Sequence, residues 1–254
     1  MIGHAGRMRL LPSSPRGRKG VVIGLIVAVV LAASAYGLDL LVNARTFQFY
    51  GGLTHRVDVP DKVVALTFDD GPDPAGAVGL LDSLAAAGVP ATFYLTGREL
   101  ERNPDLGARI ATAGHEVGNH SYSHGRMVFV SAETVATEIE RTDALIRRTG
   151  YRGEITFRPP HGKKLLALPR YLADHRRRTI MWDVEPDSYP EVAASASGIV
   201  EHTVEHVRPG SIVLLHGMYQ SRATTRQAVV PLVERLRGLG YRFVTVSELL
   251  ARRP

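Results

Sequence analysis

The stretch that decides the fold is VVALTFDDGPDP, residues 63–74, an apolar run that ends on two adjacent carboxylates and then turns. Its first six residues are apolar, β-branched or aromatic on both faces, which is typical of a buried strand in a parallel sheet. Two carboxylates at such a tip, Asp69 and Asp70, repel each other and are costly to desolvate. The sequence therefore predicts a cation or hydrogen bonds beside them; a solvated Asp-Asp-Gly turn is the alternative.

The rest of the chain alternates short apolar runs with helix-length segments. The pattern predicts strands at 63–68, 91–96, 116–119, 155–159, 179–184, 211–216 and 242–246, and helices at 76–87, 104–113, 132–148, 164–175, 193–207 and 225–238. A strand–helix rhythm of this kind indicates an α/β fold with about seven parallel strands, open or closed into a barrel. With 254 residues, 44% of them hydrophobic, the chain can bury the core of one such domain, expected at 62–254.

The N-terminal region is typical of a membrane-directed segment. Residues 1–20 carry five Lys and Arg and no acidic residue, and residues 21–38 carry no charge. We expect a cytoplasmic basic N-terminus (1–20), a transmembrane anchor at 21–42, and a tether at 43–61 that leads into an extracytoplasmic domain. A cleavable signal peptide is the first alternative, because Ala33-Ser34-Ala35 has the form of a cleavage site, and it predicts a secreted protein. A buried soluble helix is the second.

Composition excludes some kinds of partner and site. The chain has no cysteine, so disulfides and thiolate metal sites are excluded. A net charge of +6 suits an anionic partner such as nucleic acid or a cell-wall polymer, but much of the excess lies near the N-terminus. No nucleic-acid-reading motif accompanies the arginines at 222, 226, 235 and 237, which we interpret as a charged helical face. We therefore expect no nucleic-acid partner.

Polar residues gather where the predicted strands end, the edge at which such folds place their chemistry. These residues include Asp69, Asp70, His120, His124, Arg158, His161, Asp183, Asp187 and His216. His120 and His124 are four residues apart, so on a helical turn their imidazoles share a face. Together with one aspartate they can hold a divalent cation with open positions, as in a catalytic site. A surface histidine pair without metal is the alternative.

Four motifs, TFDDGPD, NHSYSH, RPPHG and LLHG, follow one another along the chain. In this order they resemble the motifs of the polysaccharide deacetylase family of carbohydrate esterases, which includes chitin and peptidoglycan deacetylases. The resemblance covers residues 62–254. It implies a distorted (β/α) barrel, a divalent metal that is usually zinc, and hydrolysis of N-acetyl groups on sugars.

The resemblance also implies roles for individual residues. It makes Asp70, His120 and His124 metal ligands, Asp69 the general base, His216 the general acid, and Arg158 the partner of the base. The physical requirements of amide hydrolysis agree, because acid and base need different chemistries at separate positions.

Two motifs depart from the family pattern. In Pro160-His161-Gly162 a histidine replaces the usual aromatic residue; its backbone N–H is still expected in the oxyanion hole. In WDVEPDSYP we expect Asp187, or as second choice Asp183, to orient His216. Tyr189 is a candidate for the missing aromatic wall, and Trp182 for the sugar site, with packing inside the barrel as its alternative.

These observations predict an exported or membrane-anchored metal-dependent deacetylase. Its expected substrate is an N-acetylated amino-sugar polymer at the cell surface, with peptidoglycan or a related glycan as first choice. A small-molecule amide hydrolase on the same barrel is one alternative, although the short predicted loops argue against a closed pocket. A carbohydrate-binding pseudoenzyme is the other, and the complete set of ligands, base, arginine and acid argues against it.

Overall fold

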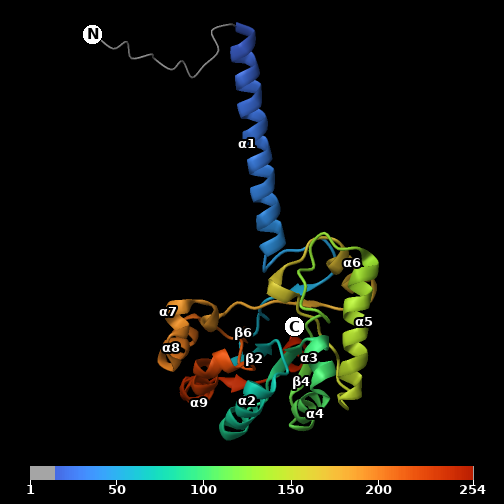
Figure 1. The fold of residues 1–254 in the computed structure, drawn as a ribbon. Coiled ribbons are helices and arrows are strands. Elements are labelled where there is room, and N and C mark those ends of the chain that lie inside the picture. The colour runs from blue at the N-terminus through green and yellow to red at the C-terminus, as the bar shows by residue number, and fades with distance from the viewer. Residues whose placement is uncertain (1–14, 254) are drawn as a thin grey trace, which may run out of the picture. The chain divides into compact units, whose positions relative to one another are not determined.

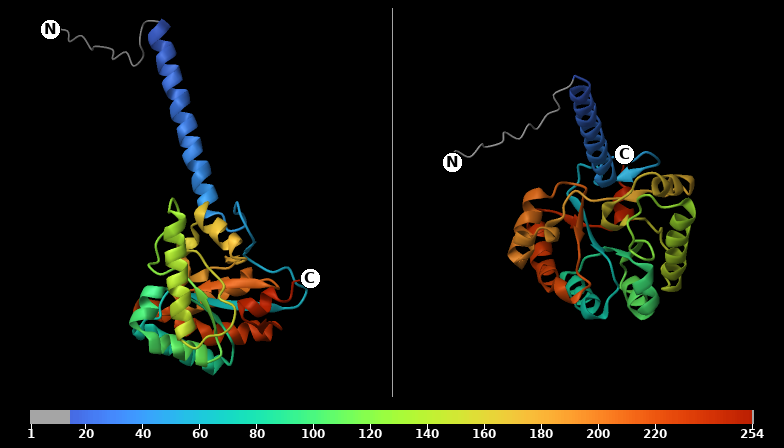
Figure 2. Two further views of the ribbon diagram at one scale, coloured as in Figure 1. Left: turned by 90° about the vertical axis from the view of Figure 1, so that its right-hand side faces the viewer. Right: turned by 45° about the horizontal axis from the view of Figure 1, so that its top comes forward.

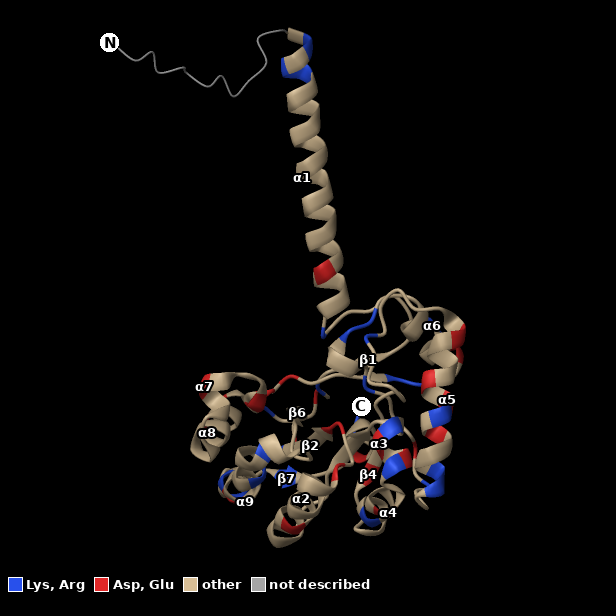
Figure 3. Cartoon of the chain, in the orientation of Figure 1, with Lys and Arg blue, Asp and Glu red and all other residues tan. Residues whose placement is uncertain are grey.

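The computed structural model describes residues 15–253, and the chain divides into two units that meet between Val42 and Asn43. In the first unit, helix α1 (Pro15–Asn43) is 29 residues long, with a mean hydropathy of 2.5 over its most apolar window. Its Lys and Arg lie in its first turns, and Asp39 lies near its other end (Figure 3). Length and composition suit a membrane span or a signal sequence. Residues 1–14 of the predicted basic N-terminus lie outside the described residues.

The second unit is built on parallel strands. They are β1 (Leu53–Thr54), β2 (Val63–Asp69), β3 (Thr92–Leu95), β4 (Glu116–Asn119), β5 (Thr179–Ile180), β6 (Ser211–Leu215) and β7 (Arg242–Phe243). The larger sheet has the order β4-β3-β2-β6, with β7 also paired to β2, and β1 pairs with β5. Each of these pairings is parallel, which confirms the predicted α/β class.

Helices surround these strands (Figures 1 and 2). They are α2 (Pro74–Ala87), α3 (Gly97–Arg102), α4 (Pro104–Thr112), α5 (Ala132–Arg148), α6 (Ala167–Asp174), α7 (Pro190–Ala193), α8 (Ala196–His206), α9 (Ala223–Gly238) and α10 (Val246–Leu250), with 3-10 turns at Pro160–Gly162, Pro186–Ser188 and Gln220–Arg222. The six predicted helices are present within about three residues at each end. The short helices α3, α7 and α10 were not predicted, because too few residues show a period.

The predicted strand at 155–159 is wrong. Only Phe157 pairs there, through isolated bridges to Asn119 on one side and Thr179 on the other. Pro159 and Pro160 have no N–H to donate, so a regular ladder cannot continue through them. A further single bridge joins Val184 to Val213. The ring of strands thus closes through single residues, and the barrel is distorted.

The two faces of β2 explain how the site is positioned. Val64, Leu66 and Phe68 belong to the core cluster that includes side chains of helices α2 and α9. Val63 and Ala65 belong to a second cluster, together with residues of β6 and α10. Side chains alternate along a strand, so Asp69 shares the inner face of Val63 and Ala65 and reaches the carboxyl end of the barrel.

Candidate active site

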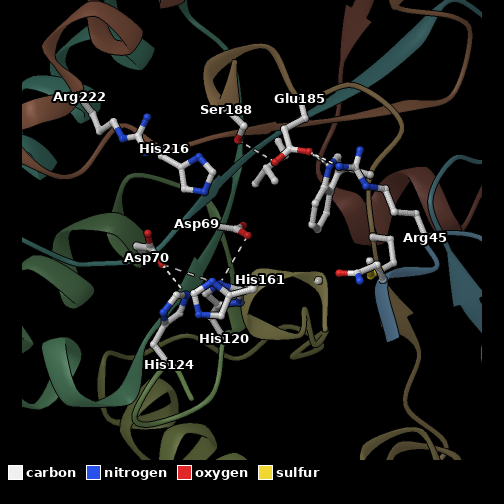
Figure 4. A pocket seen from close by; sticks show the side chains of 15 residues that line it. Arg45, Asp69, Asp70, His120, His124, His161, Glu185, Ser188, His216 and Arg222 are labelled. Carbon is white, nitrogen blue, oxygen red and sulfur yellow. Dashed lines mark hydrogen bonds and ion pairs between the residues drawn. The ribbon is translucent and has the colours of Figure 1, made fainter. Parts of the chain in front are cut away.

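A pocket of about 400 Å³ opens where the strands end (Figure 4). Its lining includes Asp69, Asp70, His120, His124, His161, Gly162, Trp182 and His216. Most of the predicted site residues therefore lie around one cavity, although up to about 150 positions separate them in the sequence.

Asp70, His120 and His124 each direct one potential ligand atom to a common point. These atoms lie within 4.8 Å of one another. His124 Nε2 is 3.1 Å and His120 Nε2 is 3.8 Å from Asp70 Oδ1. Two imidazoles and a carboxylate are suitable donors for zinc and similar divalent ions, and a set of three leaves room for water or substrate.

The protonation of His120 and Asp70 also suits a metal, whereas burial would lower the pKa of His124 but the hydrogen bond and charge of Asp70 outweigh it and raise that pKa. His120 Nδ1 lies 2.8 Å from the Arg158 carbonyl oxygen, which can only accept, so Nε2 is the nitrogen left with a lone pair. Burial lowers the pKa of His120 and keeps the ring neutral. Burial opposes ionisation of Asp70, but the hydrogen bond and charge of His124 lower its pKa below the usual range.

The predicted helical turn that would align the histidines is absent. Residues 120–124 form an irregular loop, in which Ser121 and His124 have φ angles of 67° and 60°. The Ser121 N–H donates to Asn119 Oδ1, and the His124 N–H donates to Ser121 Oγ. Left-handed conformations are unfavourable for non-glycine residues. These side-chain hydrogen bonds therefore stabilise the loop and align the two histidines, as a helical turn would otherwise do.

Asp69 lies against a buried arginine. Arg158 Nη1 donates to Asp69 Oδ1 at 2.6 Å and to Thr67 Oγ1 at 2.7 Å, and the arginine is fully buried. The second carboxylate oxygen, Asp69 Oδ2, lies 3.6 Å from His120 Nε2 and borders the pocket. The arginine thus holds one oxygen of Asp69 by a charge-assisted hydrogen bond and leaves the other for chemistry.

His216 borders the pocket on another side, at the end of β6. Its Nδ1 lies 3.1 Å from Asp187 Oδ1, and its backbone N–H donates to Asp187 Oδ2 at 2.6 Å. Burial alone would lower the pKa of His216, but the hydrogen bond and charge of Asp187 outweigh it and raise the pKa. Asp183 instead accepts from Ser211 and from the Ile212 N–H, so the structure places Asp187 beside this histidine.

The third motif forms a 3-10 turn with His161 at φ 56°. The Gly162 N–H donates to the Pro159 carbonyl, whereas the His161 N–H has no protein acceptor among the described residues. The His161 ring lies 4.6 Å from the ring of His124. A Cβ at Gly162 would come within 3.0 Å of Trp182, so this close approach favours glycine. Pro160 is buried and does not line the pocket.

Part of the pocket wall was not predicted. Arg45, Glu185, Ser188 and Arg222 line it, and Trp182 donates from its indole to Glu185. Glu185 lies in WDVEPDSYP, a stretch that the sequence had already marked. Arg45 comes from the predicted tether and Arg222 from the predicted charged face, where no motif marked them. Tyr189 lies outside the lining, with its ring against His202.

Comparison with known proteins agrees with the fold and the motifs. The polysaccharide deacetylase family model matches residues 56–180. A peptidoglycan-N-acetylglucosamine deacetylase of Bacillus cereus is 34% identical over 79% of this chain and 93% of its own. The crystal structure of a peptidoglycan N-acetylglucosamine deacetylase has a TM-score of 0.71, with 29% identity over 77% of this chain and 91% of its own.

A third comparison concerns activity within the same family. A CE4 family pseudoenzyme from Bacillus anthracis has a TM-score of 0.69, with 27% identity over 78% of this chain and 69% of its own. The fold and the relatives place the chain in the class of carbohydrate deacetylases. This chain belongs to the polysaccharide deacetylase family.

Proposed function

We propose that this protein hydrolyses N-acetyl groups on glucosamine units of peptidoglycan, with a divalent metal, zinc as first choice, held by Asp70, His120 and His124. One observation carries the proposal. Asp69 holds one oxygen on the buried Arg158 guanidinium and presents the other to the pocket beside the three potential ligands. A carboxylate oriented by a guanidinium, with its second oxygen beside such a group, is suited to act as a general base.

The residues divide the reaction between them. When bound, the metal would lower the pKa of a water and polarise the acetyl carbonyl. Asp69 accepts a proton from the attacking water, and the His161 N–H stabilises the oxygen that becomes negative. His216, protonated and oriented by Asp187, donates a proton to the departing nitrogen. Water and acetamide thus yield acetate and a free amine on the sugar.

We further propose that α1 remains uncleaved as a single membrane anchor, with the N-terminus in the cytoplasm and the catalytic unit outside. The 18 uncharged residues from 21 to 38 support this, as does the basic charge on the N-terminal side alone. A glycan of the cell wall is accessible from that side of the membrane.

Acetate release tests the proposed activity. The full-length protein in detergent, supplied with zinc, should release acetate from peptidoglycan and lose that activity in a chelator, with recovery on adding metal back. Chitin oligomers and a small N-acetyl amide serve as competing substrates. No acetate from any substrate with any divalent metal would contradict the proposal and identify a pseudoenzyme.

A further inference from the structure

The chain that leaves α1 is part of the active site. We define the 43–45 segment as Asn43, Ala44 and Arg45. Asn43 and Arg45 both line the pocket that contains Asp69 and His216. The predicted tether is therefore, at its start, one wall of the site.

Arg45 is held by several partners on one side of the pocket. Its Nη2 lies 2.5 Å from Glu185 Oε2, and its guanidinium lies 4.8 Å from the centre of the Trp182 ring. Glu185 also accepts from the Trp182 indole at 2.8 Å and from Ser188 Oγ at 2.7 Å. Figure 4 shows this cluster across the pocket from Asp70 and His124. A carboxylate with three donors fixes the arginine in place.

Two adjacent lysines hold the other residues of the segment. Lys163 Nζ donates to Asn43 Oδ1 at 2.6 Å. Lys164 is 1% exposed, and its ammonium donates to the Ala44 carbonyl oxygen. A buried ammonium is costly without a hydrogen-bond acceptor, so releasing Ala44 would leave that charge without one. Both lysines directly follow the third motif, which ties the segment to the catalytic loop.

The sequence puts this wall immediately after the apolar helix. The apolar run ends at Leu40-Leu41-Val42, and Arg45 is only three residues beyond Val42. A fully extended chain spans about 3.5 Å per residue, so three residues reach about 10 Å at most. This limit comes from the covalent chain and holds for any orientation of the helix.

We propose that the 43–45 segment confines the deacetylase to glycan held at the outer surface of the membrane, with lipid-linked amino sugars as the substrate class. The inference rests on the proposed deacetylase activity and on the anchored state of α1. A flexible tether would let the domain reach distant glycan. A segment fixed by Glu185, Lys163 and Lys164 cannot lengthen without losing those contacts.

A rigid spacer tests this confinement. A helical (EAAAK) insert of about 20 residues between Val42 and Asn43 would separate the wall from the anchor by about 30 Å, at about 1.5 Å per residue. Full-length protein in phosphatidylethanolamine–phosphatidylglycerol vesicles would receive two zinc-supplemented substrates. One is N,N′-diacetylchitobiose coupled to a dialkyl lipid in the same vesicle, and the other is the same sugar free in solution. The matched control carries the same insert after Pro254.

The spacer should lower acetate release from the lipid-linked sugar at least about 10-fold, because a short sugar on a lipid no longer reaches an active site about 30 Å farther from the anchor. Release from the free sugar should stay within about two-fold, and the C-terminal insert should change neither rate. Unchanged rates on both substrates, or equal losses on both, would overturn the confinement. No acetate from the native protein on either substrate would instead refute the deacetylase activity itself.

Arg45 gives a second test that leaves the anchor intact. Arg45→Ala removes the ion pair with Glu185 and frees the wall, so KM for the free sugar should rise about five-fold while kcat changes less than about two-fold. Arg45→Lys keeps the charge and should recover part of the loss. An unchanged KM in Arg45→Ala, or a fall in kcat alone, would overturn the role of the 43–45 segment as a wall of the site.

Discussion

Two of the buried carboxylates, Asp69 and Glu116, are each 3% exposed. Asp69 ends strand β2 and borders the pocket, whereas Glu116 begins strand β4. Asp69 is paired with a charged donor, Arg158, through one oxygen. Glu116 accepts only from neutral donors, namely Thr92, Thr156 and both the N–H and the hydroxyl of Ser247.

The difference shows what burial of an acid means in this fold. The four hydrogen bonds of Glu116 join β4 to β3, to Thr156 and to the start of α10, and Glu116 does not line the pocket. Burial raises its pKa, against the effect of its donors. Asp69 keeps one oxygen directed toward the pocket while a guanidinium compensates its charge. A spare acceptor beside a cavity therefore distinguishes a reactive carboxylate from a structural one.

The largest effect should come from Asp69→Asn. The amide cannot accept a proton, so kcat should fall about 10³-fold, within the range of general-base catalysis, while metal content stays near that of the native protein. Acetate release measures kcat, and metal analysis measures the metal content. Asp183→Asn is the matched control, since this aspartate is held by Ser211 outside the pocket, and its activity should stay within about two-fold. Retained activity in Asp69→Asn would contradict the proposed base.

Removal of a proposed ligand should affect metal binding rather than folding. His120→Ala should weaken zinc affinity by at least about 100-fold, because one of three donors is lost. Competition with a chromogenic chelator measures this affinity. His115→Ala is the control, because His115 is also buried but accepts from the Ala91 N–H away from the pocket. Equal zinc affinity in both variants would refute the site.

The comparison predicts that Glu116, unlike Asp69, contributes to stability and not to catalysis. Glu116→Ala leaves buried donors of Thr92, Thr156 and Ser247 without an acceptor, so the free energy of unfolding should fall by about 2–3 kcal/mol while kcat of the folded protein is unchanged. Urea denaturation measures the loss. Because the folded-state pKa of Glu116 is raised, the native protein should lose stability relative to Glu116→Gln as pH rises above about 4.3. A large loss of kcat in Glu116→Ala would show that the two carboxylates are coupled.

The sequence predicted the fold and the site best where residue type and position along a strand were themselves informative. The alternation of apolar strands and helices was enough to predict the parallel α/β class, and the order of the four motifs selected residues that line one pocket. The conformation of residues 120–124 was not predictable, because side-chain hydrogen bonds within a loop leave no periodicity. Arg45 was missed for a different reason, since its partner Glu185 is 140 positions away and nothing local marks the pair. The single bridges at Phe157 were missed for a similar reason, because they form between segments far apart in the sequence when the barrel closes.

The smallest predicted effect concerns His216 and can be read from pH dependence. Asp187 raises the pKa of this histidine against the effect of burial, so the protonated form persists to higher pH. If His216 is the general acid, kcat falls as pH rises through its pKa. Asp187→Asn removes the negative charge and should lower that pKa, so the alkaline limb of the kcat profile should move by about one unit toward lower pH.

Thr225→Val is the control for this shift, because it removes a hydrogen bond to Asp187 Oδ2 but keeps the charge. Its alkaline limb should move by less than about 0.3 units, which separates the effect of charge from that of packing. A limb that stays in place in Asp187→Asn would assign the proton donor to a group other than His216. A limb that shifts in Asp187→Asn while zinc affinity is unchanged would place proton donation on the β6 side of the pocket, apart from Asp69 and the three potential ligands.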